Sequence, residues 1–334
     1  MTMSSDAGAA MFSIYILTYN EELDIAACLD SALLSDDVIV VDSFSSDRTV
    51  EIAQRYTQNH PVRVVQHAFE SHGKQRTWML RSIPTKYEWV YILEADELMT
   101  PELFQECLCT IQQPEHIGYY VAERVMFMGR WIKHSTQYPR YQMRLFRKDK
   151  VWFSDYGHTE REVCEGSTGF LKETYPHYTQ GKGFERWFDK HNTYSTNEAK
   201  ETVRQLAQGQ VNWRNLFFGK TEVERRHALK DLSQRVPFRP LVRWIYMYFF
   251  LGGILDGRAG FAWCTLQAFY EYMILLKVWE LRHMPVPSLP DLPSEAAAAL
   301  EEPKGLERGN TARSALAKSD PAMSDPGTIV ENVK

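Results

Sequence analysis

The sequence lacks several patterns that would place it in common protein classes. No GxGxxG turn follows the first predicted strand and no GxxxxGK[ST] loop occurs, which counts against dinucleotide oxidoreductases and P-loop enzymes. Neither of the two long apolar segments, at 241–255 and about 260–279, reaches the ~20 uninterrupted apolar residues of a membrane span. Residues 1–10 are small and polar without a basic region, so we expect no secretory signal peptide.

Charge and cysteine usage exclude further classes. The net charge of −5 argues against a general polyanion binder. The cysteines are odd in number and show no ligand spacing, so we expect reduced thiols of a cytosolic protein and no zinc site. The 334 residues are enough for one to three domains of ordinary globular composition.

The N-terminal half alternates between strand and helix patterns. The predicted strands are 12–17, 38–41, 62–65 and 89–93, and the predicted helices between them are 22–33, 47–56 and 74–82. The strands are rich in Val and Ile, which is typical of right-handed βαβ units around a parallel sheet. Further along, the sequence predicts strands at 119–125 and 142–147, a polar loop at 153–166 and a helix at 184–204.

Polar side chains follow three of the predicted strands. Residues 18–21 follow the first strand, Asp42 ends the second, and Glu94 and Asp96 follow the fourth. In parallel sheets, ligands bind beyond the carboxyl ends of the strands. Two carboxylates two positions apart repel each other unless a divalent cation or a hydroxyl-rich ligand lies between them, and hard oxygen ligands suit Mg²⁺ or Mn²⁺. The alternative is a strand that ends in an ordinary acidic loop.

The C-terminal part combines apolar, aromatic and basic residues. Segment 213–258 is rich in Arg and Lys and contains the aromatic stretch 241–255. This pattern favours an interfacial helix on an anionic membrane surface. The alternatives are a pair of core helices or an oligomer interface. Binding of nucleic acid is disfavoured, because the cations are interleaved with a long apolar run.

A series of motifs along residues 12–282 resembles a family 2 glycosyltransferase. The later motifs are similar to the bacterial branch that includes the lipopolysaccharide inner-core β-1,4-glucosyltransferases. In order, the motifs are ILTYNEE (16–22), VVDS (40–43), SDRT (46–49), GKQR (73–76), LEADE (93–97), PEL (101–103), YPRYQMRLFR (138–147), HNTYST (191–196) and GGILDGRAG (252–260).

The resemblance implies a GT-A fold, a nucleotide-sugar donor, a divalent metal (Mn²⁺ or Mg²⁺) and inversion at the anomeric carbon. It assigns the nucleoside pocket to Thr18, Asn20 and Glu21, and the base, expected to be uracil, to Asp42. It further places Lys74 or Arg76 near the base or diphosphate, Glu94 near the ribose or sugar, and Asp96 on the metal.

The sequence departs from the family pattern at three positions. Glu94 stands where the family usually has Asp, and Thr77 where it often has Asn. Thr159 separates His158 from Glu160, where the family has an adjacent His-Glu pair.

An inverting transfer needs a general base for the acceptor hydroxyl. The candidates are Glu160 and Asp155, of which we favour Glu160, and the ordinary alternative for either is a solvated loop acid.

Several further residues are candidates for ligand contacts. His158 and His177 are candidate metal or phosphate ligands, and Arg144 and Arg147 are candidates for diphosphate or acceptor binding. Trp131 and Tyr138 are candidates for stacking on a sugar. Each of these residues has a structural alternative: a satisfied core histidine, an exposed strand arginine or a packed aromatic ring.

The sequence therefore predicts an α/β GT-A protein with a helical, membrane-associating C-terminal extension. The expected segments are a flexible 1–11, a catalytic domain at 12–180 with nucleotide (12–115) and acceptor (116–180) halves, helices at 181–284 and a disordered tail at 285–334. The predicted activity is transfer of a hexose from a UDP-sugar to a glycolipid or oligosaccharide, at the cytoplasmic face of a bacterial inner membrane. The alternatives are a nucleotide-binding scaffold without turnover and a sugar nucleotidyltransferase. A homo-oligomer is compatible with the sequence.

Overall fold

A computed structural model describes residues 11–156, 159–179, 181, 183–208, 238–284 and 328–329. These residues fall into two compact units. The first unit contains the described parts of 1–191, 238–270 and 326–334, and the second those of 192–237 and 271–325.

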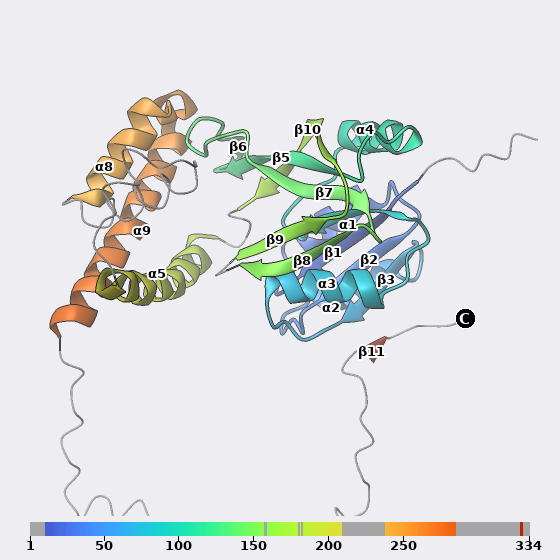
Figure 1. Cartoon of the computed structure of the whole chain (residues 1–334), viewed down its shortest axis with the longest axis horizontal. Helices are drawn as coiled ribbons and strands as arrows, with labels where there is room; N and C mark the ends of the chain where they lie inside the picture. The colour runs from blue at the N-terminus through green and yellow to red at the C-terminus, as the bar shows by residue number, and fades with distance from the viewer. Residues whose placement is uncertain are drawn as a thin grey trace, which may run out of the picture. The chain divides into compact units, whose positions relative to one another are not determined.

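A nine-stranded sheet forms the centre of the first unit (Figure 1). Its order is β10-β5-β7-β4-β1-β2-β3-β11, with β6 paired to β5. The strands are β1 (Ser13–Thr18), β2 (Val38–Asp42), β3 (Val62–Gln66), β4 (Trp89–Glu94), β5 (Gly118–Phe127), β6 (Arg130–Trp131), β7 (Tyr141–Arg147), β10 (Thr168–Tyr178) and β11 (Thr328–Ile329). Strand β1 pairs in parallel with β2 and β4, and β2 with β3, whereas β7 runs antiparallel between β4 and β5. The predicted α/β architecture is confirmed.

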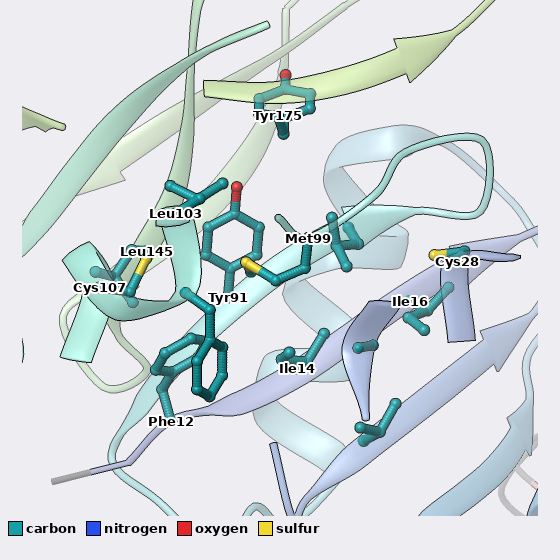
Figure 2. Packing of buried hydrophobic residues seen from close by; sticks show 14 of the residues in the cluster. Phe12, Ile14, Ile16, Cys28, Tyr91, Met99, Leu103, Cys107, Leu145 and Tyr175 are labelled. Atoms are coloured by element: carbon teal, nitrogen blue, oxygen red, sulfur yellow. The ribbon is translucent and has the colours of Figure 1, made fainter. Parts of the chain in front are cut away.

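Helices cover both faces of this sheet, which explains its continuous apolar strands. Helices α1 (Ile25–Ala32), α2 (Thr49–Tyr56) and α4 (Pro101–Gln112) pack on one face, and α3 (His72–Ser82) packs on the other. On β1, the side chains of Ile14 and Ile16 enter the first core and that of Tyr15 enters the second. Figure 2 shows the first core, in which Tyr91 of β4 lies among residues of β1, α4 and β10.

The prediction of a polar loop at 153–166 is wrong. Strands β8 (Val151–Tyr156) and β9 (Thr159–Cys164) form an antiparallel hairpin there, on the same face as α3. Phe153 is buried in the second core, and the Thr77 hydroxyl of α3 donates to its carbonyl oxygen (2.6 Å) and accepts from its amide (3.0 Å). The hairpin was missed because polar and charged residues surround its few buried side chains.

The predicted helix over 241–255 is also wrong as a single element. The segment is divided into α8 (Arg239–Ile245), a π-helix η1 (Tyr246–Phe250) and a 3₁₀ turn η2 (Gly253–Asp256). Gly252 at φ 78° and Gly257 at φ 63° break the helix, because left-handed backbone favours glycine. Helix α9 (Gly257–His283) follows, and within the described residues no helix has the length and apolar content needed to cross a membrane.

Asp256 fastens this C-terminal segment to the sheet within the first unit. Its carboxylate accepts hydrogen bonds from the amides of residues 133–135 (2.7–3.2 Å) and from the Ser135 hydroxyl (2.6 Å). Burial would raise the pKa of Asp256, but the bonds from Ser135 and His134 outweigh it and lower the pKa. The start of α9 and the end of β5 pack together in a small core that contains Phe127, Ile132 and Ala259.

The second unit contains the C-terminal parts of α5 (Gly183–Gln208) and α9. Within it, the Lys277 ammonium donates to the Asn192 carbonyl (2.6 Å) and to the Ser195 (2.8 Å) and Thr196 (2.7 Å) hydroxyls. The described end of the chain is β11, which pairs antiparallel with β3. The rest of the predicted tail and residues 213–237 of the basic segment lie outside the described residues.

Candidate active site at the carboxyl edge of the sheet

The polar residues predicted at three strand ends lie at one edge of the sheet. In the parallel register, Thr18 of β1 is opposite Asp42 of β2, and Leu17 is opposite Glu94 of β4. The loops that continue from these strands are joined by hydrogen bonds. Asn20, held at φ 54°, accepts from the Ser46 amide (2.7 Å), and the Glu21 amide donates to the Thr49 hydroxyl (2.7 Å).

The Asp42 carboxylate is buried within this edge, where neighbouring residues already donate hydrogen bonds to it. It is fully buried and accepts hydrogen bonds from the Ser45 amide (3.0 Å) and the Gln66 side-chain amide (2.9 Å). The Ser45 hydroxyl also donates to it. Beside it, the buried Thr18 hydroxyl has no hydrogen-bond partner among the described residues. The edge therefore offers one uncommitted hydroxyl next to a carboxylate that organises the β2–α2 turn.

Arg76 of α3 links two of the predicted site residues. Its guanidinium contacts Glu94 (2.7 Å) and Glu160 of β9 (2.9 Å), and it is buried between them with 6% of its side chain exposed. Arg76 also lies over the Phe153 ring, 5.4 Å from its centroid. The helix thus brings the end of β4 and the β8–β9 hairpin to one point.

Arg144 forms a second shared ion pair beneath Glu94. This fully buried guanidinium donates to Glu97 (2.6 Å), to the Tyr175 hydroxyl (3.2 Å) and to the Ile92 carbonyl (3.3 Å), and lies 3.6 Å from Glu94. The Glu97 carboxylate in turn accepts from the Glu94 amide (3.0 Å). Arg144 is therefore an internal counterion, and it does not face an acceptor as the sequence analysis expected.

Burial and the two arginines shift the pKa values of these carboxyl groups in different directions. Burial would raise the pKa of Glu94, but Arg144 and Arg76 outweigh it and lower the pKa to about 2. Burial raises the pKa of Glu97 to about 8 against the attraction of Arg144. Burial also raises the pKa of Glu160, opposed by Arg76. A carboxyl group with a raised pKa is a better proton acceptor when it is ionised.

Asp96 is the predicted metal ligand, and the His177 side chain of β10 is hydrogen-bonded to its carboxylate. His177 lies between Asp96 (Nε2 to Oδ2, 3.3 Å) and the buried Glu123 (Nδ1 to Oε2, 3.2 Å). Burial lowers the pKa of His177, but the hydrogen bonds to both carboxylates raise it well above its usual value. Arg140 forms an ion pair with Glu123.

The Asp96 side chain fits a metal that is shared with a ligand. It is 27% exposed, and its Oδ1 has no hydrogen-bond partner among the described residues. Over the same part of the chain, no three His, Cys, Asp or Glu side chains are grouped so that they could hold a metal alone. Mg²⁺ and Mn²⁺ at phosphate sites are commonly held by one or two carboxylates plus phosphate oxygens. The protein thus supplies one carboxylate, and the remaining ligands would come from a diphosphate and water.

The structure shows three other predicted residues, Asp155, Lys74 and Arg147, engaged in contacts elsewhere. Asp155 accepts from the Ser71 hydroxyl (2.7 Å) and the Gly73 amide (3.1 Å), at the start of α3. Lys74 is exposed and pairs with Glu70. Arg147 pairs with Glu88 at the amino edge, where it lies opposite Trp89. His158 lies outside the described residues.

Three buried residues of the site were not found from the sequence: Glu97, Glu123 and Tyr175. Glu97 offered a weak signal, because it directly follows the acidic motif that contains Asp96. Glu123 sits within a strand that is otherwise largely buried, and a charge at such a position needs a partner. Its partners Arg140 and His177 are distant in the sequence, so no spacing rule reveals them.

This chain is similar in sequence to known glycosyltransferases. The Glycosyl transferase family 2 profile matches residues 13–164. Lipopolysaccharide core biosynthesis glycosyltransferase LpsC of Rhizobium meliloti (strain 1021) is 24% identical over 277 residues, which cover 81% of this chain and 92% of LpsC. The uncharacterized glycosyltransferase RT0209 of Rickettsia typhi is 26% identical over 208 residues, covering 58% of this chain and 68% of the relative.

Among solved structures, this chain is similar to S. aureus TarS 1–349 in complex with UDP-GlcNAc, with 16% identity and a TM-score of 0.41. The match covers 82% of this chain and 92% of the TarS chain. The matched family segment contains β1 to β4, Asp96, Arg76 and Glu160, which are the elements and residues that build the edge described above. Residues 13–164 match the Glycosyl transferase family 2 model, so this segment of the chain is a family 2 glycosyltransferase domain.

Proposed function

We propose that this chain is a metal-dependent inverting glycosyltransferase that moves a hexose from a UDP-sugar to a cell-envelope glycolipid such as lipopolysaccharide core. The observation that carries the proposal is Asp96, a partly exposed carboxylate with a free oxygen. At the same edge, Glu94, Glu97 and Glu160 are paired with arginines, and Asp42 is engaged by Ser45 and Gln66. The name of the relative LpsC supports the acceptor class.

The donor would lie across the ends of β1, β2 and β4. Thr18, Asn20 and Glu21 would line the nucleoside pocket. The buried Asp42 would either stabilise the backbone that forms this pocket or contact the base. Arg76 would approach the diphosphate from α3, where it already faces two carboxylates. Asp96 would hold the divalent cation, with His177 fixing its orientation. When bound there, the cation would offset charge that develops on the leaving diphosphate.

The transfer step needs one proton acceptor from the protein, and Glu160 fits this role better than Asp155. Glu160 points to the Arg76–Glu94 pair, whereas Asp155 is engaged at the start of α3. Glu160 would take the proton from the acceptor hydroxyl while that oxygen forms a bond to the anomeric carbon. The bond from this carbon to the nucleoside diphosphate breaks on the opposite face, and the configuration inverts.

The site of action would be the cytoplasmic face of a bacterial inner membrane. Large apolar side chains of α8, η1 and the turn after them are exposed, including Phe250 (77%) and Leu255 (68%), with Arg239 and Arg243 on the same segment. Such a surface suits an anionic lipid headgroup layer. In co-sedimentation with vesicles, we expect binding to phosphatidylglycerol that is lost in Phe249→Ser/Phe250→Ser. Equal binding of the variant would exclude this surface.

The experiment that tests the activity is calorimetric titration with UDP, GDP and dTDP, with and without Mn²⁺. We expect UDP to bind in a metal-dependent manner, and we expect Asp96→Asn to remove the metal dependence. A metal-dependent preference for GDP or dTDP would keep the reaction class and replace the donor. Absence of binding by all three nucleotides would instead favour a scaffold without turnover.

A further inference from the structure

Arg124 of β5 is a half-buried cation without a carboxylate partner among the described residues. Its Nε atom is buried and donates no hydrogen bond. The other non-exposed arginines of residues 11–156 each pair with a carboxylate: Arg63, Arg76, Arg144 and Arg147. A buried N–H group that lost water and gained no partner costs free energy. Arg124 therefore has capacity for an acceptor that the described protein does not supply.

A second uncommitted donor lies next to Arg124. The indole Nε1 of Trp131 on β6 is also buried without a hydrogen-bond partner among the described residues. The Arg124 guanidinium is 6.0 Å from the Trp131 ring centroid, and Tyr138 packs edge-on against the same ring at 5.1 Å. The Lys133 ammonium is 5.5 Å from the Trp131 ring and 5.6 Å from the Tyr138 ring. Two aromatic rings and two cations thus form one group, called here the Arg124–Trp131 cluster.

A similar arginine–tryptophan pair at the opposite edge differs in having a carboxylate partner, although the Nε atom of Arg147 is also buried without a hydrogen bond. Arg147 lies over Trp89 at 5.9 Å, which is nearly the distance of Arg124 from Trp131. The Arg147 guanidinium, however, makes two hydrogen bonds to Glu88 (2.7 and 2.8 Å). The fold therefore supplies a carboxylate to one arginine–tryptophan pair and none to the other.

The cluster lies toward the carboxyl end of β5. Arg124 is opposite Pro176 of β10, whereas the adjacent Glu123, whose side chain points to the other face of the strand, contacts His177. On β5, Arg124 shares a strand face with Tyr120, whose hydroxyl donates to Glu162 on the hairpin that carries Glu160. The cluster therefore faces the side of the sheet from which Glu94, Arg76 and Glu160 project.

The sequence around the cluster contains basic residues and no acidic ones. Residues 124–148 contain no Asp or Glu, and exposed Arg130 and Lys133 follow Arg124. Two carboxylates next to this segment are already engaged, Glu123 by Arg140 and His177, and Asp256 by residues 133–135. The excess of cations favours binding of an anion. Aromatic rings next to cations provide planes for the apolar faces of sugars together with donors for their charged groups.

We infer that the Arg124–Trp131 cluster is an acceptor subsite for a saccharide that carries a negative charge, as a phosphate or a carboxylate. The inference rests on the proposed glycosyltransferase function, because it names the acceptor class of that reaction. Arg124 binds the anionic group, the Trp131 N–H donates to a sugar or phosphate oxygen, and Lys133 adds charge at the exposed side. With the saccharide bound in this way, the acceptor hydroxyl would point toward Glu160, and the diphosphate of the donor would bind at Asp96.

The test is an NMR titration of the full-length ¹⁵N-labelled protein saturated with UDP, which occupies the diphosphate site. The probes are mannose 6-phosphate, galacturonate, neutral mannose and inorganic phosphate. The indole N–H signal of Trp131, identified by its loss in Trp131→Phe, reports on the cluster. We expect this signal to shift with one or both anionic sugars, and the sugar that binds identifies phosphate or carboxylate as the group that is recognised.

Matched variants decide whether Arg124 carries the recognition. We expect Arg124→Met to weaken binding of the anionic sugar about tenfold or more, as loss of a charge-assisted hydrogen bond does, and Arg124→Lys to recover part of it. Arg147→Met removes a similar arginine–tryptophan contact elsewhere and should leave the affinity unchanged. Both variants should bind UDP like the parent chain.

Four results would overturn the inference: no shift with either anionic sugar, equal binding of neutral mannose, equal binding of inorganic phosphate alone, or an equal loss of affinity in Arg147→Met. UDP binding is measured in the same samples. A protein that binds UDP and fails these titrations loses only the acceptor subsite, whereas a protein that binds no nucleotide loses the proposed function itself.

Discussion

The two edges of the central sheet treat charge in different ways. At the amino edge, charges form separate pairs: Arg63 with the buried Asp37, and, nearer the surface, Lys86 with Asp36 and Arg147 with Glu88. At the carboxyl edge, Arg76 and Arg144 each contact two carboxylates, and His177 lies between two more. Exposed pairs contribute little to stability, whereas removal of one buried partner leaves an uncompensated charge. The carboxyl edge is therefore a coupled network, and the amino edge is a set of independent contacts.

The largest difference is expected between two arginines of β7. Arg144→Met removes the buried counterion of Glu97 and Glu94, and we expect a loss of about 3–5 kcal/mol in the free energy of unfolding. Arg147→Met, three residues away, removes a partly exposed pair and should cost at most about 1 kcal/mol. Urea unfolding of both variants measures the difference. Similar losses would mean that the two edges are energetically alike.

The next effect concerns catalysis at Asp96. We expect Asp96→Asn to lower kcat/KM by about a hundredfold to a thousandfold, because the Asn side chain cannot offer the charged oxygen that a cation requires. Far-ultraviolet circular dichroism should show an unchanged fold. The matched control is Asp36→Asn at the amino edge, which should retain activity. A fully active Asp96→Asn variant would remove the metal from the proposed mechanism.

A smaller effect is expected at Glu160, together with a pH signature. Burial raises the pKa of Glu160, and a base acts only when ionised, so activity should fall as the pH drops through this raised pKa. The acidic limb of the kcat/KM profile should therefore lie above the range of an ordinary carboxyl group. Glu160→Gln should lower kcat/KM about a hundredfold and remove this limb. Retention of the limb in Glu160→Gln would assign the base to another residue.

The smallest effect belongs to the exposed Lys86–Asp36 pair. We expect Lys86→Ala to change the free energy of unfolding only slightly in low salt, because both side chains remain near water. In 1 M NaCl the difference should disappear, since exposed charges are screened. A loss that persists in high salt would show that this edge also contains a coupled pair.

Local sequence patterns were sufficient to predict the nucleotide half of the fold. Strands β1, β2 and β4 are largely apolar runs buried on both faces, and a strand of this kind leaves a clear signal. Strand β3 is less regular, with Arg63 and Gln66 partly exposed among its valines. The strand-end residues Asp42, Glu94 and Asp96 were found for the same reason, because a strand end is visible in the sequence. Hairpin β8–β9 was missed because only one of its faces packs against α3.

The partners within the site could not be predicted in the same way. Arg144 and Glu97 are 47 residues apart, and nothing in the local pattern of β7 distinguishes a buried arginine from an exposed one. Asp155 and Glu160 lie opposite each other on one hairpin, yet one is engaged at the start of α3 and the other faces Arg76. Such roles depend on which way a side chain points once the chain has folded.

Gly73, in the first turn of α3, lies against the hairpin with no room for a side chain. A Cβ at this position would be 2.7 Å from Asp155 Oδ1 and 2.8 Å from the Ser154 carbonyl carbon. The helix that carries Arg76 and the hairpin that carries Glu160 thus meet backbone to backbone, and Thr77 bonds them one turn later. The β8–β9 hairpin could be exchanged between related enzymes to alter what they glycosylate. Such an exchange would have to include α3, because the helix and the hairpin must fit each other.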